Sequence, residues 1–293
     1  SESFSISQNF NYYFTLNEKN IFAFEAQHLL RNEDPFYNAN LENNENFQPT
    51  ALGLGLDDSF LNFNINQNRK VNSNQLDAKI DYWNILNSKS DLNITIGNIY
   101  SKQDFRSEIF QSLIDNNDQF YPTPLINNGH DSNDINYIFD DLYLGLRYRL
   151  KAGKFTISPG FSAHSYNSKN DQYDVINSDL VSDISYKKSF FKFLPNFNLI
   201  IQLKDSENIR LNYSMRTQFT DITKIARGLV LNNYNSIFIG NQYLQNAVSH
   251  NVNLNYYSFN LFNYTNIYAG LNYNKSIDQI RNLTSFESVI ATS

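Results

Sequence analysis

Residues 140–166 read DDLYLGLRYRLKAGKFTISPGFSAHSY, and this stretch decides the fold class. Apolar side chains occupy every second position on both sides of a turn-like segment at residues 151–154, at Leu142, Leu144, Leu146, Tyr148 and Leu150 and then at Phe155, Ile157, Pro159, Phe161 and Ala163. A period of two marks one face of a β-strand, because successive side chains point to opposite faces. The stretch therefore predicts two antiparallel strands joined by a tight turn, with one apolar face.

The same pattern recurs along the chain. Alternating runs flank four further short turn-like segments, at residues 17–20, 87–91, 204–208 and 259–263. Five tight hairpins give about ten long strands. Alternation over about nine to eleven residues is the length of a tilted strand that crosses a bilayer. We therefore predict an all-β fold, a transmembrane antiparallel up-and-down β-barrel, over residues 1–293, with no separate second domain.

The segments that connect these hairpins are of another kind. Residues 31–50, 102–138, 167–178 and 221–247 are long, polar and rich in Asn, Asp and Gln. Short turns at one end and long loops at the other are typical of outer-membrane barrels, in which the short turns are periplasmic. A soluble β-sandwich would have shorter strands and more evenly spaced turns. We therefore expect residues 167–178, among others, to be an extracellular loop.

Composition excludes several functional classes. The chain has 293 residues, a net charge of -6 and no Cys, and its mean hydropathy is -0.49. No apolar run approaches the ~20 residues of a membrane helix, and the absence of Cys excludes disulfides and thiolate metal sites. Mild acidity without a basic stripe argues against nucleic acid. The four His are scattered without ligand spacing, so we expect no metal site and no cofactor.

The second face of the predicted strands is polar and carries the candidate site. Arginine at the lipid midplane would cost about 2–4 kcal/mol, so Arg147 and Arg149 should point into the lumen together with His164. Lumen arginines could attract an anionic solute. They could instead form ion pairs with Asp77, Asp81 or Glu25, which is the interpretation we favour. Aromatic loop residues could stack on a sugar or a siderophore, or could pack the loops together. The candidate substrate-binding residues are Arg147, Arg149, His164, Arg216, Tyr121 and Tyr234.

Acidic pairs offer the best enzymatic candidates. Asp57-Asp58 and Asp140-Asp141 are adjacent carboxylates, and His164 should lie on the strand beside Asp141 at similar height. A complete ten-stranded barrel could carry such groups at its extracellular rim, as omptin-type surface proteases do. The same acidic residues could equally be solvated loop residues without a catalytic role, and nothing in the sequence fixes their geometry. We therefore expect no enzyme and no catalytic residues.

Four blocks in the second half resemble the barrel of TonB-dependent receptors from Bacteroidetes-type bacteria. They are LPNFNL at residues 194–199, IRLNYSMR at 209–216, NSIFIGNQYL at 235–244 and SHNV at 249–252. The sequence departs from the family pattern after Arg216, where Thr217 stands in place of the usual proline step. The resemblance implies a 22-stranded barrel in the outer membrane of a Gram-negative bacterium, plugged by an N-terminal domain. It also implies energised uptake of a scarce nutrient.

About ten strands are roughly half of such a barrel, and no plug is recognisable. We therefore expect a partial barrel of a longer receptor, because open strand edges are costly in hydrocarbon. The implied partners are outer-membrane lipid, a TonB-type energising complex acting through the plug, and a surface lipoprotein or larger outer-membrane complex. The alternatives are a complete ten-stranded surface protease and a passive porin.

Overall fold

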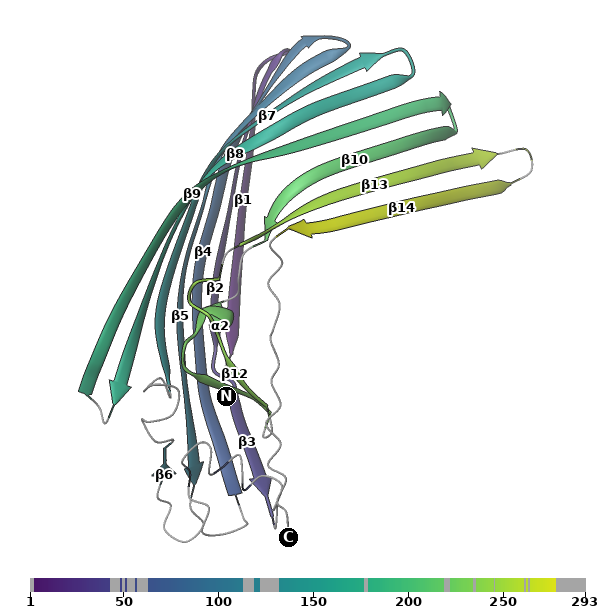
Figure 1. The fold of residues 1–293 in the computed structure, drawn as a ribbon. Helices are drawn as coiled ribbons and strands as arrows, with labels where there is room; N and C mark the ends of the chain where they lie inside the picture. Colours follow the sequence, from purple (N-terminus) through teal and green to yellow (C-terminus); the bar gives the residue numbers. More distant parts are fainter. Residues whose placement is uncertain are drawn as a thin grey trace.

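The chain folds into one long, curved antiparallel sheet (Figure 1). The computed structural model describes residues 3–42, 48, 51, 56, 63–112, 119–121, 132–176, 179–218, 222–233, 236–244, 246–260, 262 and 264–277. Ten strands follow one another in chain order: β1 (Phe4–Asn17), β2 (Asn20–Glu33), β4 (Phe63–Asn87), β5 (Ser90–Ser112), β7 (Asn133–Ala152), β8 (Phe155–Ile176), β9 (Asp179–Lys204), β10 (Glu207–Gln218), β13 (Ala247–Asn260) and β14 (Thr265–Ile277). This up-and-down order confirms the predicted fold class.

Two short strands extend the sheet at the long-loop end. Strand β3 (Phe36–Leu41) pairs with β4, and β6 (Gln119–Phe120) pairs with β5, which makes a 12-stranded sheet. A second, two-stranded sheet consists of β11 (Leu229–Asn233) and β12 (Ser236–Ile239), and it follows the short helix α2 (Ile222–Ile225). No helix in the described part of the chain is long and apolar enough to cross a membrane.

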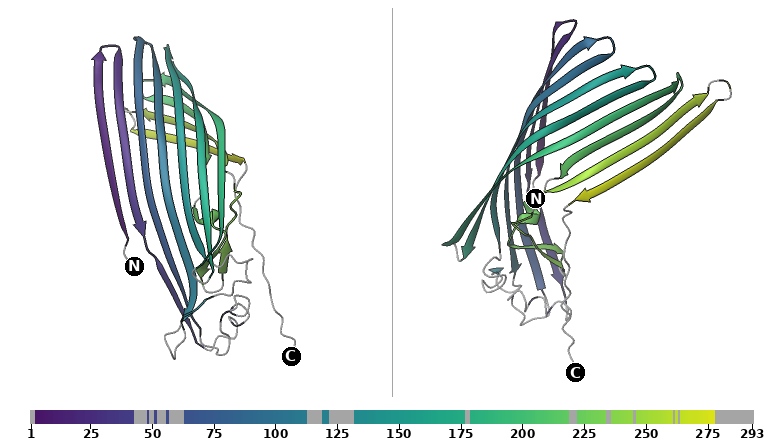
Figure 2. Two further views of the ribbon diagram at one scale, coloured as in Figure 1. Left: turned by 90° about the vertical axis from the view of Figure 1, so that its left-hand side faces the viewer. Right: turned by 45° about the horizontal axis from the view of Figure 1, so that its top comes forward.

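The large sheet bends into a trough (Figure 2). Its first and last strands, β1 and β14, are each paired on one side among the described residues. Both are exposed along their whole length. The described strands therefore form an open wall with two free edges.

The five short turns lie at one end of the trough, as predicted, and local hydrogen bonds explain three of them. Asn17 Oδ1 accepts the backbone N–H of Lys19 at 3.0 Å, Asn87 Oδ1 accepts that of Lys89 at 2.8 Å, and Asn260 Oδ1 accepts that of Phe262 at 2.9 Å. A hydrogen bond from the backbone N–H to an Asn side chain two residues earlier stabilises a tight turn locally. In the turn after β7, Gly153 has a φ of 60°, a conformation that glycine adopts without steric cost.

The prediction of a loop at residues 167–178 was wrong. Strands β8 and β9 continue through this region, with Asn167 opposite Ser189 and Ile176 opposite Asp179. Strands β4, β5, β7, β8 and β9 are 25, 23, 20, 22 and 26 residues long. Beyond the lipid both faces of a strand meet water, so the alternation of apolar residues disappears while the backbone ladder continues. Residues 31–50 and 102–138 contain strand extensions for the same reason.

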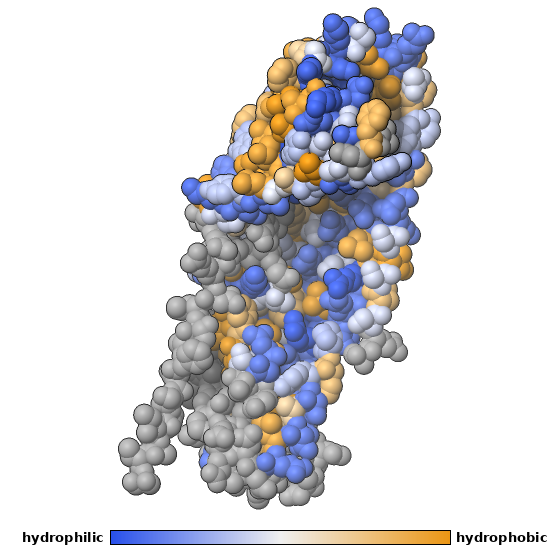
Figure 3. Space-filling view, turned by 90° about the vertical axis from the view of Figure 1, so that its right-hand side faces the viewer, coloured by the Kyte–Doolittle hydropathy of each residue, from blue (hydrophilic) through white to orange (hydrophobic). Residues whose placement is uncertain are grey.

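The two faces of the hairpin at residues 140–166 have the predicted character. Leu142, Leu144, Leu150 and Phe155 are exposed on the convex face, at 54%, 47%, 36% and 46%. Arg147, Arg149 and Ser158 line a cavity on the concave face. In the space-filling view, hydrophobic side chains gather in patches among hydrophilic ones on the upper part of the molecule, which the turn-side halves of the strands build (Figure 3).

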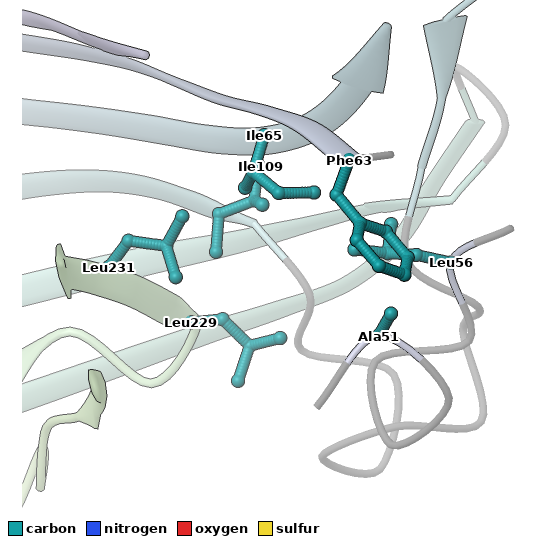
Figure 4. Packing of buried hydrophobic residues seen from close by; sticks show 7 residues of the cluster. All are labelled: Ala51, Leu56, Phe63, Ile65, Ile109, Leu229 and Leu231. Atoms are coloured by element: carbon teal, nitrogen blue, oxygen red, sulfur yellow. The ribbon is translucent and has the colours of Figure 1, made fainter. Parts of the chain in front are cut away.

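The hydrophobic core lies at the long-loop end, on the concave side. One cluster joins Ala51 and Leu56 to Phe63 and Ile65 of β4, Ile109 of β5, and Leu229 and Leu231 of β11 (Figure 4). A second cluster joins Phe105 and Ile135, on β5 and β7, to Ile222, Ile225, Ala226 and Val230. The connection between β10 and β13 is therefore packed against the wall. We call its described residues, 222–233 and 236–244, the docked segment.

A charge on adjacent residues of β7 distinguishes the two faces. Leu144→Lys places an ammonium on the convex face, where we expect it to make insertion less favourable by about 2–4 kcal/mol and to reduce assembly strongly. Gly145→Lys places the same charge in the lumen, where a Cβ would have its nearest contact with Thr95 at an ordinary 3.4 Å. The fraction of folded protein in isolated membranes, read from heat-dependent gel mobility, measures both. Equal assembly of the two variants would contradict the assignment of faces.

Candidate functional site

The concave wall encloses a polar cavity of about 1160 Å³ near the short turns. Arg147 and Arg149 of β7 and Arg216 of β10 all line it, so these three predicted site residues are brought together. Their predicted orientation into the lumen is confirmed by this position. Most of the remaining lining is supplied by Asn and Ser side chains of β8, β9, β10, β13 and β14.

The predicted ion-pair partners of these arginines were wrong. Arg149 bonds Asp91, with its Nε 2.5 Å from Asp91 Oδ2. Glu25 and Asp81 instead pair with Lys79, at 2.9 and 3.3 Å. The sequence does not indicate these ion pairs, because they depend on which residues the strand register places opposite each other. Asp91, for example, lies opposite Arg149.

Arg147 and Arg216 are left without an acidic partner among the described residues. Guanidinium groups present fixed N–H donors that match planar carboxylates and other oxyanions. Two such groups on one cavity wall make the cavity attractive to an anion.

A row of asparagines crosses the same wall, and the sequence analysis did not identify it as a site. Register places Asn198, Asn212, Asn253 and Asn272 opposite one another on β9, β10, β13 and β14, and Asn198 Nδ2 donates to Asn212 Oδ1. Carboxamides both donate and accept hydrogen bonds, so the row offers neutral polar groups beside the arginines. The signal was the abundance of Asn at inward positions of the alternating strands.

His164 lies in a second, smaller cavity of about 460 Å³ with Ser162 and Arg147. Its Nδ1 is 3.0 Å from both carboxylate oxygens of Asp141, and its Nε2 is 2.8 Å from Ser162 Oγ. The predicted proximity of His164 and Asp141 is therefore observed. Asp140, by contrast, points to the convex face, where Asn98 donates to it at 2.8 Å.

Aromatic rings hold the imidazole in place. The rings of Tyr143 and Tyr166 both stack with that of His164, at centroid distances of 5.2 and 5.3 Å. Asp141 is 2% exposed. The chain of hydrogen bonds resembles a Ser-His-Asp triad, but Ser162 sits within a continuous ladder, opposite Gly145 and Leu194. Backbone N–H groups in such a ladder are already used and cannot form an oxyanion hole.

Two further predicted site residues lie away from these cavities. Tyr121 donates to Gln119 Oε1 at 2.6 Å and its ring is 6.2 Å from that of Phe110, so it packs within the long-loop end. Tyr234 lies outside the described residues, as do Asp57, Asp58 and His130. No group of three or more possible metal ligands occurs in the part of the chain that the structure describes.

Three buried carboxamides fasten the docked segment to the concave wall. Gln67 of β4 donates to Leu231 O at 3.1 Å and accepts Leu231 N–H at 2.7 Å. Asn133 of β7 donates to Leu229 O at 3.3 Å and accepts Gly228 N–H at 2.7 Å. Each amide therefore satisfies a backbone donor and a backbone acceptor of β11 or of Gly228 just before it, on the side that has no strand partner.

Gln172 of β8 makes the third contact. Its Nε2 donates to Ile225 O at 2.9 Å, and its Oε1 accepts from the backbone N–H and the Nε of Arg227, at 3.3 and 3.1 Å. The backbone also approaches the wall closely at Gly228, where an added Cβ would lie 2.0 Å from Ser132 O. The docked segment is consequently held in one position across β4, β7 and β8, inside the long-loop end of the trough (Figure 1).

Comparison with known proteins agrees with this architecture. Residues 26–292 match the model of the outer membrane protein beta-barrel family. The siderophore receptor PiuA from Acinetobacter baumannii superposes with a TM-score of 0.61 at 9% identity, over 92% of this chain and 40% of that chain. The ferric yersiniabactin uptake receptor FyuA from Yersinia pestis gives 0.58 at 10% identity, over 88% and 33%.

The closed form of the ferric-catecholate import receptor Fiu from E. coli K12 gives a TM-score of 0.56 at 12% identity, over 88% of this chain and 38% of that chain. No curated protein sequence matches the chain. At these identities the likeness concerns the fold alone. The chain spans between 33% and 40% of the length of these three receptors.

Loss of one carboxamide should loosen the docked segment. Gln67→Leu removes both hydrogen bonds to Leu231 and leaves two buried backbone groups unsatisfied, at a cost of about 1–3 kcal/mol each. We expect the backbone amide of Leu231 to exchange with deuterium at least tenfold faster, with the strand pairing of β10 and β13 unchanged. Gln103→Leu, on the concave face of β5, is the matched control, because no hydrogen bond joins Gln103 to the docked segment. Unchanged exchange in Gln67→Leu would contradict the role of this amide.

Proposed function

The chain belongs to the outer membrane protein beta-barrel family, and from that premise we propose that it is part of the barrel of a TonB-dependent receptor for energised nutrient uptake. Its location is the outer membrane of a Gram-negative bacterium. The remaining wall, the plug that fills the lumen and the contact with the energising complex belong to the proposal. The four sequence blocks noted above favour the Bacteroidetes-type branch.

Free strand edges support a longer barrel. Unsatisfied backbone groups in hydrocarbon cost several kcal/mol each, and β1 and β14 expose such edges over 14 and 13 residues. The ten strands in sequence order correspond in extent to a part of the three receptors, of which the chain covers 33–40%. A wall completed by further strands removes both edges.

The observation that carries the transport proposal is the cavity lined by Arg147, Arg216 and the asparagine row. Its lining suits a hydrated, anionic solute, which the arginines attract and the amides solvate during passage. The three receptors of the same fold are named for ferric yersiniabactin, a ferric catecholate and a siderophore. We therefore propose an anionic metal chelate as the first substrate class to test. Passage along the wall involves no covalent step.

Uptake by cells tests this proposal. Under iron limitation, the bacterium that carries the full-length gene should accumulate ⁵⁵Fe from an anionic chelate such as ferric citrate. Deleting the gene and inactivating the energising complex should each abolish the saturable component, without further loss in the double mutant. Full uptake in either mutant for every anionic chelate tried would reject the proposal.

The two unpaired arginines should set the affinity of that uptake. A hydrogen bond to a charged group contributes about 1.5–3 kcal/mol, so Arg147→Gln and Arg216→Gln should each raise the apparent KM for chelate uptake about tenfold or more. Arg106→Gln is the control, because this arginine is exposed on the convex face and pairs with Asp134 at 3.2 Å. An equal effect of all three variants would show that the cavity arginines have no special role.

A surface hydrolase is the second candidate, and the hydrogen bonds among Asp141, His164 and Ser162 are the observation that favours it. We propose that no such chemistry occurs, because backbone donors for an oxyanion are missing around Ser162. A fluorophosphonate probe, which reacts with activated serines, should therefore label the wild-type protein no more than Ser162→Ala. Labelling that disappears in Ser162→Ala, His164→Ala and Asp141→Asn would establish the enzyme instead.

A further inference from the structure

The end of β10 that carries Arg216 is supported by a strand on one side only. Strand β10 is paired with β9 as far as Ser214. In the same register Met215 would lie opposite Pro195, which has no backbone N–H to donate, and the pairing ends there. Beyond this point β9 and β10 diverge (Figure 1). Residues 215–218 therefore pair with β13 alone among the strands that the structure describes.

A side-chain hydrogen bond from β8 reaches this end of β10. The hydroxyl of Tyr166 donates to Thr217 Oγ1 at 3.3 Å, and the bond passes over β9, which lies between the two strands. Thr217 is also the residue at which the sequence departs from the resembled family pattern. A proline at this position would have no hydroxyl to accept the bond. The contact therefore depends on the residue that this chain carries in place of the proline.

The Tyr166 side chain is held firmly from several sides. It is 2% exposed. Its ring contacts three other rings, each from a different strand, namely those of Phe139 on β7, His164 on β8 and Phe190 on β9, at centroid distances of 6.0, 5.3 and 4.8 Å. His164 is in turn bonded to the buried carboxylate of Asp141. A side chain packed in this way has little room for another rotamer, so its hydroxyl stays at one place.

The position of Thr217 affects the position of its neighbour Arg216. Arg216 lines the large polar cavity together with Arg147 of β7. A strand end that is paired on one side opens more readily than one paired on both, and such opening would carry the Arg216 guanidinium away from that of Arg147. The bond from Tyr166 ties the end of β10 to the block of strands β7, β8 and β9. Because Arg147 belongs to the same block, the bond keeps the two arginines in a fixed relation.

We propose that Tyr166 is a positioning residue for solute binding, which holds Arg216 through Thr217 so that Arg216 and Arg147 bind the same anion. A site that is ordered before the ligand arrives binds it more tightly than one that must be ordered by it. The inference rests on the proposed function. It also gives the pair of Asp141 and His164 a role without covalent chemistry, because this pair holds the imidazole against the Tyr166 ring.

Hydrogen exchange of the purified full-length receptor tests the contact without any solute. In Tyr166→Phe, which keeps the ring and removes the hydroxyl, the backbone amides of residues 215–218 should exchange about fivefold faster than in wild type. Those of residues 209–214, which are paired on both sides, should be unchanged. Thr217→Val should behave like Tyr166→Phe, and it replaces that variant if Tyr166→Phe fails to assemble. Thr217→Ser retains a hydroxyl and should exchange as wild type does.

Uptake of ferric citrate by cells tests the link to Arg216. A neutral hydrogen bond changes an equilibrium constant about two- to tenfold, so Tyr166→Phe should raise the apparent KM by that factor, with the maximal rate per assembled receptor unchanged. In the Arg216→Gln background Tyr166→Phe should raise the KM no further, because Tyr166 acts through Arg216. The matched control is Tyr82→Phe, which removes a hydroxyl that bonds Asn20 near the short turns and should leave both measurements at wild-type values.

The outcomes separate this inference from the proposed function. Unchanged exchange in both Tyr166→Phe and Thr217→Val would overturn the inference. Faster exchange with an unchanged KM would also overturn it, as would a lower maximal rate alone, because the contact would then serve stability only. An equal rise of the KM in the Arg216→Gln background would show that Tyr166 does not act through Arg216. If deletion of the gene leaves chelate uptake intact, the transport proposal fails, and exchange at residues 215–218 still decides whether Tyr166 holds this end of β10.

Discussion

The pairing of backbone N–H and C=O groups across the sheet is the constraint on which the rest of the structure depends. Within hydrocarbon no water can satisfy these groups, so each strand must bond two neighbours. Antiparallel pairing links every strand to the next in this order from β1 to β14, with shifts of register only near strand ends. In a paired strand, successive side chains point to opposite faces of the sheet. Leu144 therefore faces the lipid, and its neighbour Gly145 faces the lumen.

This division also determines where charge gathers. Arginine is costly on the lipid face, so Arg147, Arg149 and Arg216 collect on one concave wall. Register then decides which of them is neutralised, since Asp91 lies opposite Arg149 and no acid lies opposite Arg147. The same inward orientation concentrates carboxamides into a row. A cavity with net positive character and neutral hydrogen-bonding groups follows from strand geometry without any loop.

The sequence predicts what depends on local periodicity: the five turns, the strand order and the faces of residues 140–166. It does not predict the strand extensions, because residues such as Asn167 and Lys169 are polar on either face and carry no period-two signal. Nor does it predict the docked segment, in which Gln67 bonds Leu231, 164 residues further along the chain. Ion pairs fail for a related reason, since the partner of Arg149 depends on the register between two strands that a long connection separates.

The carboxamides that hold the docked segment bond a backbone donor and a backbone acceptor at the same time, which neither a carboxylate nor an apolar side chain can do. The unpaired edge of β11, packed against the wall, leaves backbone donors and acceptors facing the wall side by side, and both must be bonded when buried. A carboxylate offers acceptors alone and loses hydration on burial, and a leucine offers neither kind of bond. One amide supplies both, as Gln67 does for Leu231. The long-loop end of the concave wall is thus covered by the chain itself, whereas the cavity with Arg147 and Arg216 lies nearer the short turns.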